Sequence, residues 1–249
     1  MRNMVRLEID QQIATITLDS QANRNALSAQ LVSELGGCVA EAESANVRAI
    51  VLTHVGPAFC SGGDLKERDA ESMPDSRPLI DVMIRLMDTG RPTIAAVNGA
   101  VRAGGVGLMA SCDLVVVASQ VTFALTEVRI GVAPAIISVP IMRRVSRARL
   151  AGPYLTGEAF TAEQALAIGL VTHVVDDVDE TVAALCTGIL AGSPRAIAET
   201  KRLLREVPEL DRDAAFDQMQ QLSESLFRGK DAAEGMLAFR QKRSPIWPP

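Results

Sequence analysis

TIAAVNGAVRAGGVGLMASCDLVVVAS, residues 93–119, is the stretch that decides the fold. Two short β-branched runs enclose a glycine-rich turn and a segment that can form a short helix beginning near Gly104. Three further strand-like runs lie at residues 13–19, 48–55 and 170–175. Helical patterns separate the runs, and in the first of them Ser28 occupies a typical N-cap position. This alternation predicts an α/β domain.

The composition permits a large core and argues against several classes of partner. The chain has 249 residues, 48% of them hydrophobic, and a net charge of −5. Its basic residues are scattered, so we expect neither nucleic acid nor an anionic membrane as a partner. No apolar run approaches the roughly 20 residues of a membrane helix, and the N-terminus lacks the pattern of a signal peptide. We therefore expect a cytoplasmic protein.

Beyond about residue 192 the pattern becomes wholly helical. Ser193 and Pro194 can open one helix. An apolar stripe marks another helix and consists of Phe216, Met219, Leu222 and Leu226. We predict a core region at residues 1–192 and a C-terminal helical region at residues 193–249. The helical region is too small for a core of its own, so we expect it to pack on the core region or on a neighbouring subunit.

Metal and dinucleotide sites are not predicted. The four cysteines have no CxxC spacing and are widely separated, at Cys38, Cys60, Cys112 and Cys186. GVGLMA, residues 105–110, matches the dinucleotide pattern GxGxxA. However, the preceding strand ends near Val97, too far upstream for the tight turn that a dinucleotide fold requires.

Two glycine turns are candidates for chemistry. PAFCSGGDL, residues 57–65, ends a strand and allows the N–H of Gly63 to face a ligand, while Asp64 is expected to anchor the turn. The N–H of Gly104 is free at the start of its helix. Two such amides aimed at one carbonyl oxygen would stabilise an enolate, although each segment alone is also compatible with a plain turn. Three acids in the following polar stretch are expected to be solvated: Glu67, Asp69 and Glu71.

One carboxylate, Glu127, lies in the otherwise apolar stretch TEVRIGVAP, residues 126–134. Between Leu125 and Val128 the carboxylate is expected to be partly desolvated, which would raise its pKa and suit it to proton transfer. The alternative is a surface glutamate paired with Arg129.

These residues resemble the blocks of the crotonase family, also called the enoyl-CoA hydratase/isomerase family. The resemblance covers almost the whole chain, and the blocks follow in family order: NRNALS (23–28), FCSGGDL (59–65), AAVNG (95–99), AGG (103–105), SCDLVVVA (111–118), FALTEVRIG (123–131), YLTGEAFTAEQALAIGLV (154–171) and EGMLAFRQKRSP (234–245). The resemblance implies a spiral of ββα units with a helical C-terminal region that builds homotrimers, often paired into hexamers.

The resemblance also implies an acyl-CoA thioester as ligand, with its carbonyl between the amides of Gly63 and Gly104. No separate cofactor is implied, because CoA is part of the substrate. Five residues match family positions that contact CoA: Arg24, Ala26, Leu65, Phe239 and Lys242. The acyl pocket would be lined by a variable segment, residues 68–91, and by the helix after Pro134.

Hydratases of this family use two glutamates, whereas this chain matches only one of them. Glu127 matches the second and is expected to act as the acid/base, while the first falls on Gly107. We therefore predict an enoyl-CoA hydratase-like lyase. A Δ3,Δ2-enoyl-CoA isomerase that uses Glu127 alone remains open. The third hypothesis is a catalytically idle acyl-CoA binder, against which the retention of Glu127 and both glycines argues.

Overall fold

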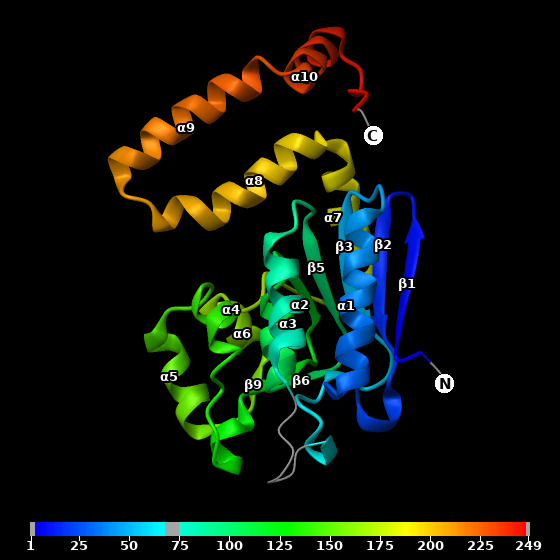
Figure 1. The fold of residues 1–249 in the computed structure, drawn as a ribbon, viewed down its shortest axis with the longest axis vertical. Coiled ribbons are helices and arrows are strands. Elements are labelled where there is room, and N and C mark those ends of the chain that lie inside the picture. Colours follow the sequence, from blue (N-terminus) through cyan, green and yellow to red (C-terminus); the bar gives the residue numbers. More distant parts are fainter. Residues whose placement is uncertain (1–2, 68–74, 248–249) are drawn as a thin grey trace.

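Two β-sheets form the centre of the fold in the computed structural model, which describes residues 3–67 and 75–247 (Figure 1). The larger sheet has the strand order β1-β2-β3-β5-β7-β10. Its strands are β1 (Val5–Asp10), β2 (Ile13–Leu18), β3 (Ala49–His54), β5 (Thr93–Val97), β7 (Leu114–Ala118) and β10 (His173–Val175). β1 and β2 form an antiparallel hairpin, and the remaining pairs are parallel.

Three strands of the smaller sheet each follow a strand of the larger sheet directly in the chain. Its order is β4-β6-β8-β9, with strands β4 (Ala58–Cys60), β6 (Ala100–Arg102), β8 (Thr122–Ala124) and β9 (Phe160–Thr161). Each of β3, β5 and β7 passes within a few residues into β4, β6 or β8, so the chain crosses from one sheet to the other and then enters a helical segment. This repeat is the predicted spiral of ββα units, and the α/β fold class is confirmed.

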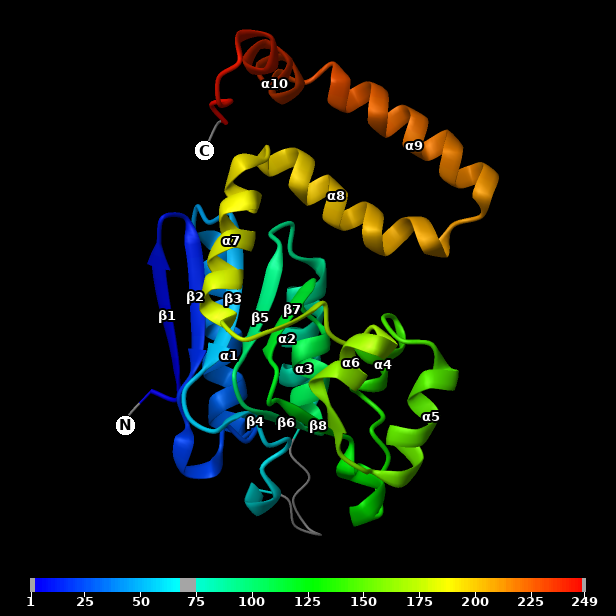
Figure 2. The ribbon, with the colours of Figure 1, turned by 180° about the vertical axis from the view of Figure 1, so that it is seen from behind.

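Helices cover both faces of the larger sheet. α1 (Ala29–Ser44), α2 (Arg77–Asp88) and α3 (Gly104–Ala110) lie on one face, and α7 (Val178–Ala191) lies on the other (Figures 1 and 2). The remaining helical segments of this part are η1 (Gln21–Asn23), η2 (Leu65–Glu67), η3 (Thr126–Ile130), α4 (Ser138–Met142), α5 (Arg147–Thr156) and α6 (Ala162–Ile168). The predicted start of α1 is confirmed, because the Ser28 hydroxyl accepts a hydrogen bond from the N–H of Leu31 at 3.2 Å.

Three long helices end the chain and extend away from the sheets (Figures 1 and 2). They are α8 (Pro194–Glu206), α9 (Arg212–Phe227) and α10 (Lys230–Gln241), with η4 (Val207–Glu209) between the first two. The predicted helix start at Ser193 is confirmed, since its hydroxyl accepts from the N–H of Ala196 at 3.1 Å. The predicted apolar stripe on α9 is partly covered within this chain, because Met219, Leu222 and Leu226 are half-buried whereas Phe216 is 70% exposed.

The predicted strand at residues 170–175 is shorter than expected. Only His173–Val175 pairs with β7, and the residues before it close the end of α6. The N–H of Leu170 donates to the carbonyl of Ala165 at 2.9 Å, so it is not free for a β-ladder. Among the described residues, no single helix is long and apolar enough to cross a membrane. The bent pair Val178–Ala191 with Pro194–Glu209, at 113°, passes that test only when the two helices are counted together.

Candidate active site

The two glycine turns, η3 and the start of α1 meet around a cavity of about 650 Å³. The residues most relevant to chemistry on its wall are Gly63, Gly104, Glu127, Leu65, Val32 and Ile137. The first three come from segments far apart in the sequence. The structure therefore brings together both predicted amides and the predicted carboxylate.

The two turns that carry the amides are in contact with each other. A Cβ built on Gly104 would lie 3.8 Å from the N of Gly63, and one built on Gly62 would lie 3.7 Å from the N of Gly104. The N–H of Leu27 donates to the carbonyl of Gly62 at 2.8 Å, and the N–H of Asp64 donates to the carbonyl of Leu27 at 3.4 Å. In this pairing the N–H of Gly63 does not donate to Leu27.

Neither amide has a protein acceptor within residues 3–67 and 75–247. Gly104 is the first residue of α3, where an N–H has no partner inside the helix. The preceding residue, Ala103, has φ of 46° and is held in this unfavourable conformation by a 2.9 Å hydrogen bond from its N–H to the carbonyl of Ala124. The surrounding sheet thus imposes the direction in which α3 begins.

The carboxylates beside the first turn are engaged in holding it. The Asp64 carboxylate accepts from the Asn23 side chain at 3.1 Å and from the N–H of Lys66 at 3.0 Å, which confirms its predicted anchoring role. Glu67 lines the cavity, yet its carboxylate accepts from the N–H of Ala29 at 2.7 Å, at the start of α1. Asp69 and Glu71 lie outside the described residues.

Glu127 is the carboxylate of the cavity wall that has an unpaired oxygen atom among the described residues. Burial raises the pKa of Glu127, as the apolar sequence around it predicts, while a hydrogen bond with its own backbone lowers it. Its Oε2 atom is buried and has no hydrogen-bond partner among the described residues. The alternative pairing with Arg129 is not seen, because the Nε of Arg129 donates to the carbonyl of Thr156 at 3.0 Å.

Gly107 lies against Ile137, a contact that no sequence pattern indicated. A Cβ on Gly107 would lie 2.3 Å from Cγ2 and 2.5 Å from Cβ of Ile137, distances that real Cβ atoms do not adopt. Ile137 is buried and lines the cavity. The space where a first glutamate would begin is therefore filled by an aliphatic side chain.

The five residues matched to CoA contacts separate into two groups. Leu65 lines the cavity, and the carbonyl of Arg24 accepts from the N–H of Ser61 beside it at 3.1 Å. Ala26 is buried next to Leu27, and neither Arg24 nor Ala26 is among the described residues of the wall.

The other two residues, Phe239 and Lys242, do not reach this cavity within one chain. They lie at the end of α10, at the far end of the molecule from β6 and the start of α3 (Figures 1 and 2). Phe239 is 85% exposed there. This chain's own cavity does not include them, because α8 to α10 project away from the core, and their place beside CoA stays a prediction for an assembly of chains.

Both segments that were expected to line an acyl pocket contribute residues to the cavity wall. Residues 68–74 of the predicted segment lie outside the described residues, while Asp75, Ser76, Pro78 and Leu79 line the cavity. Residues 134–137, at and just after Pro134, line it as well.

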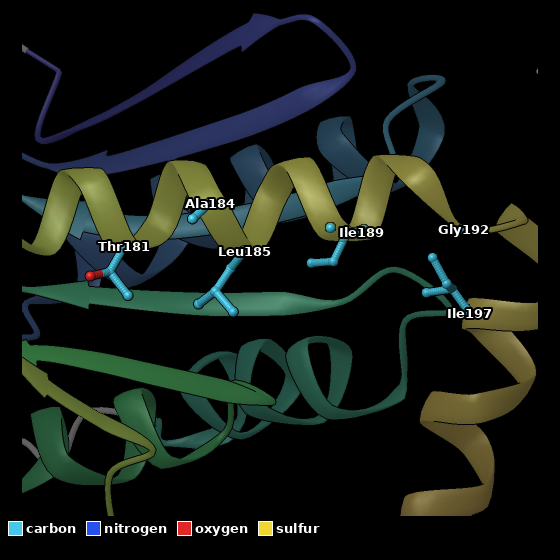
Figure 3. A pocket seen from close by; sticks show the side chains of 7 residues that line it. Thr181, Ala184, Leu185, Ile189, Gly192 and Ile197 are labelled. Carbon is cyan, nitrogen blue, oxygen red and sulfur yellow. The ribbon is translucent and has the colours of Figure 1, made fainter. Parts of the chain in front are cut away.

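A second hollow, of about 540 Å³, runs along α7 and ends at the start of α8. Figure 3 shows Thr181, Leu185 and Ile189 on one side of α7, with Ile197 at the start of α8. Its described lining carries no titratable side chain, so it offers no acid or base. Throughout the described ranges no three His, Cys, Asp or Glu side chains gather in a group that could hold a metal ion.

Known proteins resemble this chain along nearly its full length. A family model described as enoyl-CoA hydratase/isomerase matches residues 8–248. The 2,3-dehydroadipyl-CoA hydratase of Escherichia coli strain K12 is 34% identical over 246 residues, which is 94% of each chain.

Solved structures share the fold. The crystal structure of an enoyl-CoA hydratase from Mycobacterium smegmatis has a TM-score of 0.91 at 31% identity and covers 99% of both chains. The human enoyl coenzyme A hydratase domain-containing protein 3 has a TM-score of 0.93 at 28% identity, over 98% of this chain and 100% of that one. With the two-sheet spiral and the paired amides, these matches lead to one conclusion: the chain belongs to the enoyl-CoA hydratase/isomerase family, also called the crotonase family.

Proposed function

We propose that the protein is an enoyl-CoA hydratase-like lyase that adds water to a 2-enoyl-CoA thioester. The observation that carries this proposal is the meeting of two free amides and one half-buried carboxylate on the wall of one cavity. An anion can be stabilised at the amides while a proton moves at the carboxylate. This combination suits the formation of an enolate beside a thioester.

The amides of Gly63 and Gly104 would hold the thioester oxygen. As a nucleophile adds at C3, negative charge develops on that oxygen, and two aligned N–H donors stabilise it. Loss of one such donor typically raises the barrier by about 3 to 4 kcal/mol. Leu65 would flank the CoA moiety, with Arg24 and Ala26 next to it.

Glu127 would move the protons in this reaction. Its carboxylate accepts a proton from water as the water oxygen bonds to C3, and the same proton or an exchanged one is delivered to C2. The new C3–O and C2–H bonds replace the C2–C3 π bond and one O–H bond of water, so the hydroxyl group of water ends on C3 and its other hydrogen, or an exchanged one, ends on C2. Burial raises the pKa of Glu127, which makes its carboxylate a stronger base and so favours acceptance of the proton from water.

A second candidate is a Δ3,Δ2-enoyl-CoA isomerase, and the contact of Ile137 with Gly107 favours it. Glu127 would remove a proton from C2 of a 3-enoyl-CoA and return it at C4, while the same amides hold the enolate. This cycle needs no water, and an apolar wall opposite the carboxylate would exclude one.

Proton NMR in D₂O with matched 2-enoyl- and 3-enoyl-CoA substrates tests both candidates. A 3-hydroxyacyl-CoA product carrying deuterium at C2 would support the lyase, and migration of the double bond without hydration would move the assignment to the isomerase. Glu127→Gln is expected to lower turnover by about 10²- to 10⁴-fold. Glu158→Gln, the same change at an exposed position, is the matched control.

A protein that binds enoyl-CoA and neither hydrates nor isomerises it would contradict both candidates. Unchanged turnover in Glu127→Gln would remove the proposed acid/base even if a reaction were found. An idle acyl-CoA binder predicts binding with no turnover in the wild-type protein.

A further inference from the structure

Two hydroxyl groups, those of Ser138 and Tyr154, are in contact with each other and belong to α4 and α5, the two helices that follow η3 in the chain. The Ser138 hydroxyl is 2.6 Å from the carbonyl of Pro134 and 3.3 Å from the Tyr154 hydroxyl. A serine hydroxyl carries one proton, and a carbonyl can only accept, so the short contact is a donation from Ser138 to Pro134. The longer contact is the weaker branch of the same donation, from Ser138 to the Tyr154 oxygen, so the proton of Tyr154 is left for another acceptor.

Tyr154 is held close to Glu127 by the packing of α5 against η3. The Nε of Arg129, on η3, donates to the carbonyl of Thr156 at the end of α5. A Cβ on Gly157 would lie 3.0 Å from the same Nε, so the two segments are in direct contact. Tyr154 precedes Gly157 by three residues and therefore lies on the same side of the helix.

The charges of the two side chains also affect each other. Burial raises the pKa of Tyr154, its hydrogen bond with Ser138 lowers it, and the negative charge of Glu127 raises it again. Ser138 in turn directly follows Ile136 and Ile137, which line the cavity. The Ser138 and Tyr154 hydroxyls are thus in contact, and Tyr154 is near enough to Glu127 for the charge of the carboxylate to affect its pKa.

Glu127 lacks the hydrogen-bond donor that a buried carboxylate oxygen requires. Its Oε2 is buried and unpaired among the described residues, and an unpaired buried polar atom is costly. Gly107 cannot supply a partner, since it has no side chain and faces Ile137.

We propose that Tyr154 is a positioning residue for Glu127, and that its hydroxyl, which accepts from Ser138, donates a hydrogen bond to Oε2 through one water. Such a donor fixes the orientation of the carboxylate and stabilises its ionised form. It therefore sets the pH above which Glu127 can accept a proton. The expected effect of Tyr154 on the kinetics rests on the proposed function, in which Glu127 transfers protons. The expected effect of Tyr154 on the pKa of Glu127 does not.

Other charged groups around Glu127 remain in place when Tyr154 is changed. They are Arg129 on η3 and the other carboxylates of the cavity wall, Asp64, Glu67 and Asp75, while α5, which packs against η3, carries Arg147 and Arg149 at exposed positions. A change in the titration of Glu127 that follows from replacing one neutral hydroxyl is therefore assigned to that hydroxyl.

The direct test is a pH titration of the full-length protein with ¹³C-labelled glutamate side chains, followed by carbon NMR. The Glu127 signal is identified by its loss in Glu127→Gln. In Tyr154→Phe we expect the pKa of Glu127 to rise by about one unit, because the ionised form loses a donor. Ser138→Ala should produce a smaller rise in the same direction.

Leu155→Ala is the control, because Leu155 is 78% exposed on the same helix. It should leave the titration of Glu127 unchanged. An unchanged Glu127 pKa in Tyr154→Phe and in Ser138→Ala, with both proteins folded by circular dichroism, would overturn the proposal.

A kinetic measurement separates this proposal from the proposed function. With an active substrate, the acid limb of kcat/KM should move to higher pH in Tyr154→Phe by the same amount as the pKa, with KM little changed. A purely structural role would lower the unfolding temperature and leave the acid limb where it was. If no enoyl-CoA is turned over, the proposed function fails while the NMR titration still decides the role of Tyr154.

Discussion

Glu127 illustrates how one residue combines a chemical advantage with a cost in stability. Its carboxylate is half-buried, its Oε2 has no partner among the described residues, and burial raises its pKa. A carboxyl group whose pKa is raised by folding binds its proton more tightly in the folded state than in the unfolded state. Its contribution to stability is therefore favourable at low pH and is lost as the pH rises through the folded pKa.

Replacing Glu127 by Gln should stabilise the protein at alkaline pH more than at acidic pH. The neutral amide removes the burial cost of the charge, which the wild-type protein carries only when Glu127 is ionised. Thermal unfolding midpoints at about pH 8 and about pH 4 measure the difference. Glu158→Gln should show no such pH-dependent gain, and an equal gain for Glu127→Gln at both pH values would contradict the argument.

Gly107 should tolerate no side chain while Ile137 is present. We expect Gly107→Ala to destabilise the protein by about 1 to 3 kcal/mol, because its Cβ would overlap Ile137. Ile137→Ala in the same chain should recover part of this loss, which a double-mutant cycle by urea unfolding would measure.

The control for this prediction is Gly188→Ala. Nothing lies within 4 Å of a Cβ at that position on α7, so the change should be neutral or stabilising. If Gly107→Ala were as stable as Gly188→Ala, the space at residue 107 would be larger than the structure indicates.

At the scale of elements, a buried ion pair joins α8 to the larger sheet. Lys201 is 8% exposed, and its Nζ lies 2.8 Å from the carboxylate of Asp113. The same ammonium donates to the carbonyls of Leu86 and Arg91 at 2.9 and 3.0 Å. The Asp113 carboxylate also accepts from the N–H of Thr93 at 2.7 Å, so α8 is attached where β5 begins.

Lys201→Met should destabilise the protein by about 3 kcal/mol, because Asp113 would be left without its buried partner. Urea unfolding at one fixed protein concentration gives the free energy of unfolding. Arg228→Met breaks an exposed pair with Glu224 and should change that free energy by at most about 0.5 kcal/mol. Similar losses in the two variants would show that the Lys201 pair contributes little.

At the scale of the whole molecule, the C-terminal helices present apolar side chains that this chain leaves uncovered. The exposed fractions are 85% for Phe239, 70% for Phe216 and 68% for Phe227. Ala215 is the buried residue of α9, and Ala238 that of α10. Apolar surface of this extent is typical of an interface between subunits.

We therefore expect the protein to form trimers, or trimers paired into hexamers, through its C-terminal helices. Light scattering coupled to size-exclusion chromatography should give three or six times the 26.5 kDa subunit mass. Phe216→Glu should shift the mass toward the monomer, because it would place a charge in an apolar contact. Leu155→Glu, on α5, is the control for an exposed apolar residue elsewhere, and a wild-type monomer would contradict the expectation.

Much of the fold was predictable because its signals are local. Ser28 and Ser193 cap helices through their own neighbours, and the alternation of β-branched runs with glycine turns indicates strands directly. The strand at residues 170–175 was overestimated, since the turn that closes α6 competes for the same backbone groups.

The amino-acid sequence by itself determined the α/β class, the family and the identity of Gly63, Gly104 and Glu127 as site candidates, because each depends on short motifs. Only the tertiary structure decided that the three meet at one cavity, that Ile137 fills the space beside Gly107 and that α5, which carries Tyr154, packs against η3, which carries Glu127. The tertiary structure also places α10 far from that cavity within one chain. These are contacts, or absences of contact, between residues about 23 or more positions apart, and local periodicity carries no information about which distant side chains pack together.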